Sequence, residues 1–341
     1  MKPSTTESPN FPVVATRRCF QRWLLAAVAA PALAPLGALH AQPAYPGKPL
    51  KLIVPFAPGG AADIVARALG AALGQGLQQT VVIDNRGGAG SVIGTDAGAK
   101  AAPDGYTLTL TNGAAITTGP LINARIPYQP LDDFVHVFLL GSFANMLVVR
   151  AEHPAKSFKE FVAMARADKG GVSWGSAGVG SAGFLAGELL AQLGKLNMVH
   201  VPYKGTGPAM NDLLGGTLAA MFTGPALALP QIKAGRLRAL AVSSEKRSPE
   251  FPDVPTMNEL VPGAVGDAWF GIAVPAKTPP AVVERLRSEL ERSLKVPELQ
   301  ATLRDAGMAP LGLGPVAFEA FLRQETAKWT PVIRNAKITA E

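Results

Sequence analysis

The stretch Leu52-Ile53-Val54-Pro55-Phe56-Ala57-Pro58-Gly59-Gly60-Ala61-Ala62-Asp63 decides the fold. It predicts a buried strand, a turn of small residues and the start of a helix that continues to Gly74. The first N–H groups of such a helix lack partners inside the helix, and glycines let a ligand approach them. Because the helix dipole adds positive potential there, the turn suits an anion such as a carboxylate or a phosphate.

Asp63 leaves three roles open at this turn. It can cap the helix, repel an anion, or hydrogen-bond a water or an amine on the ligand. We favour capping.

Composition limits the classes of protein to which the chain can belong. Its 341 residues can bury one large core or two medium ones. Charged residues are 17% of the chain, below the average of about 25% for soluble domains. We therefore expect backbone groups and hydroxyls to recognise the ligand more than charged clusters do. The sequence contains no run of Lys or Arg that could bind along the phosphate backbone of a nucleic acid, so we expect no nucleic-acid partner.

Residues 1–41 have the layout of a bacterial export signal. Arg17 and Arg18 precede the apolar run Trp23–Leu39, and Leu39-His40-Ala41 offers a small residue at the cleavage point. The paired arginines resemble a twin-arginine signal, and an ordinary Sec signal is the alternative. Removal of residues 1–41 takes away four basic residues and one acidic residue, which lowers the net charge from +7 to +4. The only cysteine, Cys19, leaves with it, so we predict a periplasmic protein without disulfides or a thiol nucleophile.

From Pro49 onward, apolar strands alternate with helical stretches, which predicts an α/β fold with parallel sheets covered by helices. Ser157 and Glu160 have the spacing of a capping box at the start of one helix. The expected strands are 51–55, 80–84, 106–111, 134–141, 146–150, 172–176, 198–201, 217–223, 237–242 and 269–274. The other expected helices are 63–73, 91–101, 181–193, 208–214, 226–234, 280–294, 297–306 and 316–336.

These elements form two α/β series followed by a helical tail, which predicts two domains. We expect the tail to pack on one of them. If it packs on the first, the chain crosses between the domains near Val148–Arg150 and Trp269–Val274, and two crossing strands make a hinge. The expected domains are 45–149 with 270–341, and 150–269.

Four loops follow predicted strands, at the sheet edge where open α/β sheets bind ligands. They are Phe56–Asp63, Asn85–Ser91, Thr111–Ala114 and Gly175–Ser181. Each loop alone is a weak signal. Two helix-start loops that face each other across a hinge indicate an anionic ligand more specifically.

Gly178-x-Gly180-x-x-Gly183 has dinucleotide-binding spacing, which raises an enzymatic alternative. The stretch Val199–Lys204 offers no acidic residue for the ribose, but Lys204 can meet a 2′-phosphate. An exported NADP-linked oxidoreductase is therefore the alternative function.

Other catalytic patterns are weaker. The sequences around Ser176 and Ser181 lack the leading glycine of a nucleophile elbow. The histidines at 136, 153 and 200 show no pairing with a serine or a carboxylate, and no spacing suggests a metal site. We predict no catalysis, no metal and no cofactor.

Several ordered motifs together resemble a known family. They include Ile53-Val54-Pro55-Phe56-x-Pro58-Gly59-Gly60-x-x-Asp63, Asn85-Arg86-x-Gly88-Ala89-Gly90, Pro103-Asp104-Gly105-Tyr106-Thr107-Leu108 and Val201-Pro202-Tyr203-Lys204-Gly205. From about residue 45 to its end, the chain is similar to the Bug family, the periplasmic receptors of tripartite tricarboxylate transporters. The resemblance implies a two-lobed, type II periplasmic-binding-protein fold without catalysis.

The resemblance also implies a site. The loops Phe56–Asp63 and Asn85–Ser91 would hold one ligand carboxylate, partly through ordered waters, and Ser176–Ser181 with Thr223 would close from the second lobe. The expected ligand-binding residues are Phe56, Pro58, Gly59, Gly60, Asp63, Gly88, Ala89, Gly90, Asn112, Ser176, Ala177, Gly178, Ser181 and Thr223. The expected partners are a small carboxylated or polar metabolite and transporter subunits or a sensor, with the receptor a monomer.

The chain departs from the family pattern at three places. Thr223 stands where the family often has an Asp that would suit an ammonium group, which favours an uncharged or purely acidic ligand over an amino acid. Phe184 replaces a frequent histidine, and Gly113–Ile116 replaces a hydroxyl-rich segment.

Overall fold

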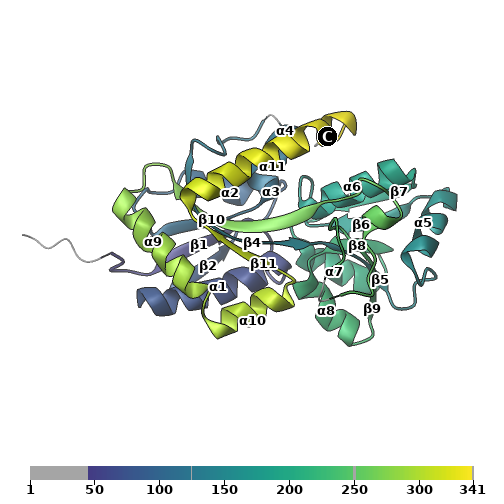
Figure 1. Cartoon of the computed structure of the whole chain (residues 1–341), viewed down its shortest axis with the longest axis horizontal. Coiled ribbons are helices and arrows are strands. Elements are labelled where there is room, and N and C mark those ends of the chain that lie inside the picture. Colours follow the sequence, from purple (N-terminus) through teal and green to yellow (C-terminus); the bar gives the residue numbers. More distant parts are fainter. Residues whose placement is uncertain (1–44, 124, 249–250, 340–341) are drawn as a thin grey trace, which may run out of the picture. The chain divides into compact units, whose positions relative to one another are not determined.

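Two mixed β-sheets form the cores of the structure (Figure 1). The computed structural model describes residues 45–123, 125–248 and 251–339, which belong to one compact unit, Tyr45–Glu341. We call the parts built on the two sheets the first lobe and the second lobe. The export signal predicted at 1–41 lies outside the described residues.

The first lobe contains a six-stranded sheet in the order β11-β4-β10-β3-β1-β2. Strand β1 pairs in parallel with β2 and β3, whereas β10 runs antiparallel between β3 and β4. Because β1, β2 and β3 are parallel, the loops that follow them meet at one sheet edge. The strands are β1 (Leu50–Val54), β2 (Val81–Asn85), β3 (Thr107–Thr111), β4 (Phe134–Ala144), β10 (Asp267–Pro275) and β11 (Ala309–Leu313).

The second lobe contains a five-stranded sheet in the order β7-β6-β8-β5-β9. Strand β6 pairs in parallel with β7 and β8, and β5 runs antiparallel to β8 and β9. Both sheets are therefore mixed, not wholly parallel as expected, because β4, β5 and β10 next to the crossings run against their neighbours. The strands are β5 (Met146–Arg150), β6 (Val172–Ser176), β7 (Met198–Pro202), β8 (Ala220–Thr223) and β9 (Leu237–Val242).

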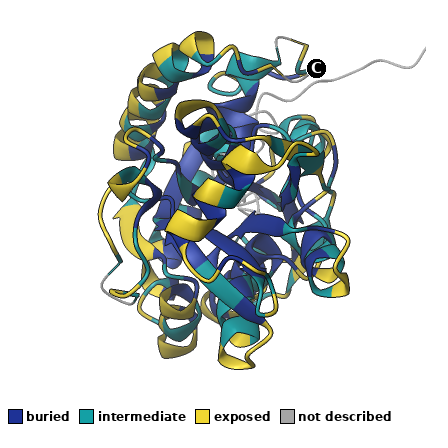
Figure 2. Ribbon diagram, turned by 90° about the vertical axis from the view of Figure 1, so that its right-hand side faces the viewer, coloured by how far each residue is buried: buried dark blue, intermediate teal, exposed yellow. Residues whose placement is uncertain are grey.

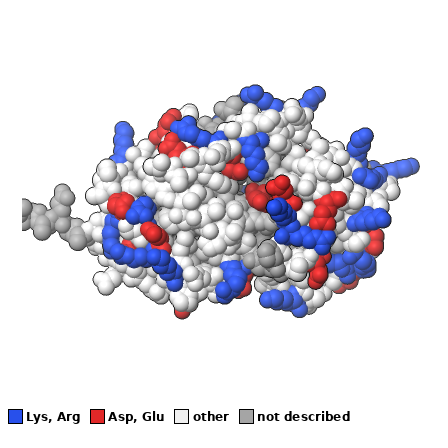
Figure 3. Space-filling view, in the orientation of Figure 1, with Lys and Arg blue, Asp and Glu red and all other residues white. Residues whose placement is uncertain are grey.

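Helices cover the sheets and turn their polar faces outward, so burial is concentrated in the strands (Figure 2). On the face shown in Figure 3, acidic and basic side chains lie among one another. The helices are α1 (Ala61–Leu77), α2 (Val92–Ala99), α3 (Gly113–Ile116), α4 (Gly119–Ile122), α5 (Phe158–Ala167), α6 (Ala182–Gly194), α7 (Thr206–Gly215), α8 (Pro225–Lys233), the 3₁₀ turn η1 (Met257–Glu259), α9 (Pro280–Ser293), α10 (Pro297–Asp305) and α11 (Pro315–Asn335).

The chain changes sheets at Asn145, between β4 and β5, and again along 243–266, between β9 and β10. Hydrogen bonds join the two crossings. Asn145 N–H donates to Ser243 Oγ at 2.9 Å, and Ser243 Oγ–H donates to the Gly266 carbonyl at 2.8 Å. The first crossing lies just before the expected Val148–Arg150, and the second is a long segment that ends just before the expected Trp269–Val274.

The tail helix α11 packs on both lobes, whereas we expected the tail on one. Phe318 and Leu322 lie in a cluster with Trp269 of the first sheet. Further along the helix, Trp329 and Ile333 lie in the core of the second lobe. One helix face is apolar over enough turns to reach both cores.

Ser157 caps α5 as predicted, but the capping box is not complete. Ser157 Oγ accepts from Glu160 N–H at 3.2 Å. The Glu160 carboxylate accepts at 2.7 Å from the N–H of Lys156, one residue before the cap. The side chain therefore reaches past Ser157 to the preceding residue.

Candidate binding site

The loop after β1 is held in shape by Asp63. Helix α1 begins after the N-cap Gly60, and Gly59 has a φ of 79°, which a glycine adopts without strain. Asp63 Oδ2 accepts from Gly59 N–H at 2.9 Å and from Arg67 Nε at 3.0 Å. Asp63 thus fixes the loop through the N–H of the residue before the N-cap, whereas no side chain caps Gly60 itself. Its other oxygen, Oδ1, is buried without a hydrogen-bond partner among the described residues.

Asp63 is ionised at neutral pH. Burial raises its pKa, but hydrogen bonds from the Arg67 guanidinium and from Gly59 N–H outweigh burial and hold that pKa below its ordinary value. A carboxylate in the first turn also interacts favourably with the helix dipole. The positive end of α1 is therefore already partly balanced by a residue of the chain itself.

The lobes touch through loops at the ends of their strands. Ala57 N–H donates to the Lys204 carbonyl at 2.8 Å, and Ala61 N–H donates to Thr206 Oγ1 at 3.2 Å. The loop Phe56–Asp63 thus faces the start of α7. The Asn85–Ser91 loop faces Ser176–Ser181 instead, since a Cβ built on Gly90 would collide with the Val179 carbonyl. The two lobes are therefore in contact through two facing pairs of loops.

Between the lobes lies a cavity of about 60 Å³. Its wall is mostly apolar with a few polar groups, which is the lining typical of a small-molecule site. Of the residues predicted from the sequence, it is lined by Phe56, Gly60, Asn112, Ala177 and Ser181. Its remaining walls include Thr118, Phe143, Asn145, Thr206, Phe222, Asp267, Trp269, Glu325 and Trp329.

Other predicted residues lie elsewhere. Ala89, Gly90 and Gly178 line a second cavity of about 330 Å³, together with Tyr203 and Lys204. Neither cavity is lined by the predicted residues Pro58, Gly59, Asp63, Gly88, Ser176 and Thr223.

Two amide side chains in the wall of the smaller cavity have unused donors. Asn112 caps α3, with its Oδ1 accepting from Ala115 N–H at 3.2 Å, and Asn145 stands at the first crossing. Their side chains are only 5% and 6% exposed. Neither Nδ2 atom has a hydrogen-bond partner among the described residues. A buried amide N–H without a partner is costly, so both donors are available for a ligand acceptor.

His200 is paired with a serine, whereas the sequence analysis found no such pair. His200 Nε2 lies 2.8 Å from Ser176 Oγ, and the imidazole contacts Trp174 and Phe184. Burial lowers the pKa of His200 to about 4. An imidazole with so low a pKa is a weak base at neutral pH, and neither residue lines the cavity. The Ser176 hydroxyl accepts from Gly178 N–H at 3.1 Å, so this pair shapes the loop.

The glycine fingerprint also serves packing. A Cβ on Gly178 would lie 2.7 Å from the Tyr203 carbonyl, and the Gly180 carbonyl accepts from Thr118 Oγ1 at 2.9 Å. Both glycines have positive φ angles, 122° and 82°. Contacts between loops therefore account for both glycines, so the fingerprint spacing does not by itself require a dinucleotide.

Sequence reasoning missed Asn145, Asp267 and Thr206. The sequence does contain a signal for Asn145, because it is a polar residue between two apolar strands. Asp267 likewise precedes an apolar strand. Thr206 follows β7 but comes next to Ala61 only through the tertiary fold.

In the described ranges no three His, Cys, Asp or Glu side chains gather as a metal site would require. No helix there is long and apolar enough to cross a membrane.

Two sheet-based lobes, two crossings and a cavity between the lobes define a two-lobed solute-binding protein. The family model described as tripartite tricarboxylate transporter family receptor matches residues 65–338, and the chain belongs to that family. Protein BugT of Bordetella pertussis is 38% identical over 293 residues, covering 85% of this chain and 90% of BugT.

Solved structures agree with the fold. The periplasmic binding protein BugD is 35% identical, with a TM-score of 0.82 over 86% of this chain and 99% of BugD. MatC of Rhodopseudomonas palustris, with bound malate, is 31% identical, with a TM-score of 0.79 over 85% of this chain and all of MatC. A further protein of that organism, with adipate, is 31% identical, with a TM-score of 0.83 over 86% of this chain and 99% of its own. The two-lobed fold and the family predicted from the sequence are confirmed. The chain is a solute-binding receptor.

Proposed function

We propose that this receptor is exported to the periplasm, captures a small carboxylate by closure of its two lobes, and delivers it to a membrane transporter of the tripartite tricarboxylate type. Its relatives MatC and the adipate-bound protein of Rhodopseudomonas palustris support a carboxylate ligand. The export layout of residues 1–41 and its periplasmic relatives support the location. Family membership supports the transporter partner.

The single observation that carries the ligand class is the pair of unused amide donors, Asn112 Nδ2 and Asn145 Nδ2. A carboxylate offers two acceptor oxygens, so one group can satisfy both amides. The aromatic side chains of Phe56, Phe143 and Trp269 line the same cavity. They exclude water and so strengthen hydrogen bonds to the bound anion.

We propose that closure turns about the crossings, at Asn145 and along 243–266. They lie close to the domain boundaries derived from the sequence, 149/150 and 269/270. Thr206 and the Lys204 carbonyl then latch the second lobe onto the loop after β1. The first-lobe loop would contribute N–H groups, with Gly60 next to the cavity.

Thermal unfolding of the purified protein with mono-, di- and tricarboxylates, amino acids and NADP tests the proposal. A ligand at 100 times its Kd stabilises the folded state by about 2.7 kcal/mol, which raises the midpoint clearly. We expect a rise with a carboxylate that is lost in Asn112→Ala and Asn145→Ala. Asn335→Ala, at an exposed position of α11, is the matched control and should keep the rise. A rise with NADP alone would contradict the proposal.

A further inference from the structure

The cavity wall holds an unused acceptor as well as the two unused donors. Asp267, the first residue of β10, lines the cavity. Its Oδ1 atom is buried and has no hydrogen-bond partner in the part of the chain that the structure describes. In the sheet Asp267 pairs with Ala144, the residue before Asn145. The unused acceptor and one unused donor therefore belong to neighbouring positions of the crossing strands.

A second acid, Glu325 of α11, lines the same cavity, but its oxygens already have partners. Glu325 Oε2 accepts from Trp329 Nε1 at 3.1 Å, and Oε1 accepts from Lys328 Nζ at 3.4 Å. Glu325 is thus held in place as a fixed acidic neighbour of the cavity. Of these two acids in the cavity wall, Asp267 is the one with a buried oxygen that accepts no hydrogen bond from the described residues.

The charges around Asp267 oppose a second anion. Burial raises the pKa of Asp267 to about 6, Lys328 lowers it, and Glu325 and Glu245 raise it. The carboxyl is therefore mostly ionised at pH 7 and takes up a proton as the pH falls through about 6. An ionised ligand carboxylate placed here would meet like charge in a water-poor cavity, whereas a hydrogen-bond donor would satisfy Asp267.

We propose that the preferred ligand is a monocarboxylate whose other end carries a hydrogen-bond donor for Asp267. This inference rests on the proposed function, because the amides of Asn112 and Asn145 hold the carboxylate end. The donor is a carboxamide, a hydroxyl or an ammonium group, three groups that share the chemistry Asp267 requires. An ionised dicarboxylate of the same length is disfavoured.

Ligands matched in length test the inference. Succinate, succinamate, 4-hydroxybutyrate and 4-aminobutyrate share a four-carbon chain and differ at one end, and adipate with adipamate repeats the comparison in a longer chain. We expect one donor-bearing acid to bind at least about tenfold more tightly than the dicarboxylate of its length at pH 7, as measured by titration calorimetry. The donor-bearing acid that binds most tightly also identifies which donor group the cavity accepts.

The variant Asp267→Asn separates this site from the rest of the cavity. We expect the donor-bearing acid to weaken about tenfold and the dicarboxylate to strengthen, because repulsion is removed. In the wild type the dicarboxylate should also bind more tightly at pH 5 than at pH 7, and this gain should shrink in Asp267→Asn. Asp305→Asn, at an exposed position of α10, is the control and should change neither affinity.

The outcomes distinguish this inference from the proposed function. A wild type that binds a dicarboxylate more tightly than every donor-bearing acid of the same length, unchanged by Asp267→Asn, would overturn the inference alone. Binding of none of these acids, and of no mono-, di- or tricarboxylate in the wider panel, would overturn both. Unfolding midpoints measured without ligand show that each variant is folded.

Discussion

Gly60 shows at the scale of one residue how a glycine can serve lobe closure. The sequence suggested that Gly60 keeps the helix start open to a ligand. In the structure a Cβ built on Gly60 would lie 2.8 Å from Thr206 Oγ1 of the other lobe. The missing side chain therefore lets the second lobe approach, in addition to bordering the cavity.

Gly60→Ala should weaken ligand binding about tenfold, because overpacking costs about 1–3 kcal/mol and here falls on the closed state. Titration calorimetry measures the Kd. In a Thr206→Ala background, which removes the clashing oxygen together with its hydrogen bond to Ala61, adding Gly60→Ala should weaken binding less than it does in the wild type. Gly215→Ala is the matched control, because a Cβ there meets nothing within 4 Å. Unchanged affinity in Gly60→Ala would show that the lobes bind ligand in a more open arrangement.

The ionisation of Asp63 makes the free energy of unfolding depend on pH. Its pKa is lowered in the folded protein, so its contribution is present above the ordinary pKa of about 4 and is lost as pH falls through the lower, folded value. Asp63→Asn should lower the free energy of unfolding by about 1 kcal/mol at pH 7, a small value because Arg67 is largely exposed. The difference from wild type should shrink towards pH 2.

Urea unfolding at several pH values measures this difference. Glu319→Gln is the control, because Glu319 and Arg323 form the same i,i+4 acid–Arg pair at an exposed position of α11. A loss in Asp63→Asn that stays constant down to pH 2 would contradict the link to ionisation.

At the scale of elements, local patterns predicted most helices and strands within a few residues. Strand β9, for example, has the predicted bounds. Strand β11 was missed because Ala309–Leu313 is mostly exposed, contains Pro310 and Gly312, and shows no alternation. It is a strand because its partner β4 stands beside it. Periodicity records the burial of a segment, whereas pairing at a sheet edge depends on the tertiary fold.

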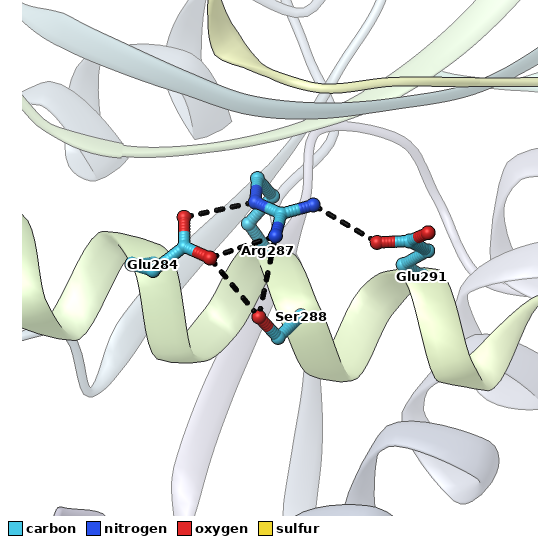
Figure 4. A network of polar contacts seen from close by, with 4 residues as sticks. All are labelled: Glu284, Arg287, Ser288 and Glu291. Atoms are coloured by element: carbon cyan, nitrogen blue, oxygen red, sulfur yellow. Dashed lines mark hydrogen bonds and ion pairs between the residues drawn. The ribbon is translucent and has the colours of Figure 1, made fainter.

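Helix α9 carries two kinds of ion pair with different expected effects. Glu284, Arg287, Ser288 and Glu291 form an exposed network (Figure 4). Glu289 is 1% exposed, is paired with Arg285 at 2.9 Å and with Arg292, and lies against Gly76 of α1. A buried acid between two arginines and a helix backbone tolerates little change.

Glu289→Ala should lower the free energy of unfolding by about 3 kcal/mol, because it leaves a gap and two arginines without their partner at the α1–α9 contact. Glu291→Ala on the same helix should have a much smaller effect, since exposed pairs are screened by water. Urea unfolding compares the two variants. Equal effects would mean that Glu289 contributes no more than a surface charge.

At the scale of the whole molecule, the cavity was only half predictable. The loops that follow strands were found, because strand order along the chain places them at one sheet edge. Asp267, Glu325 and Trp329 reach the same cavity from β10 and α11. These residues are far from the loops in sequence. The position of Asp267 depends on the return of the chain to the first sheet along β10, and that of Glu325 and Trp329 on how α11 crosses from one lobe to the other.

That crossing predicts how α11 couples stability to binding. Trp329 is 2% exposed, lies in the core of the second lobe and also lines the cavity, whereas Phe318 is buried in the first lobe. Each aromatic-to-Ala change should cost about 3–5 kcal/mol of stability. Only Trp329→Ala should also raise the Kd of the folded protein, because it removes a cavity wall and the lobe-bridging contact together. Calorimetry below the unfolding range of each variant separates the two effects. An equal Kd in both variants would mean that α11 supports the fold without taking part in closure.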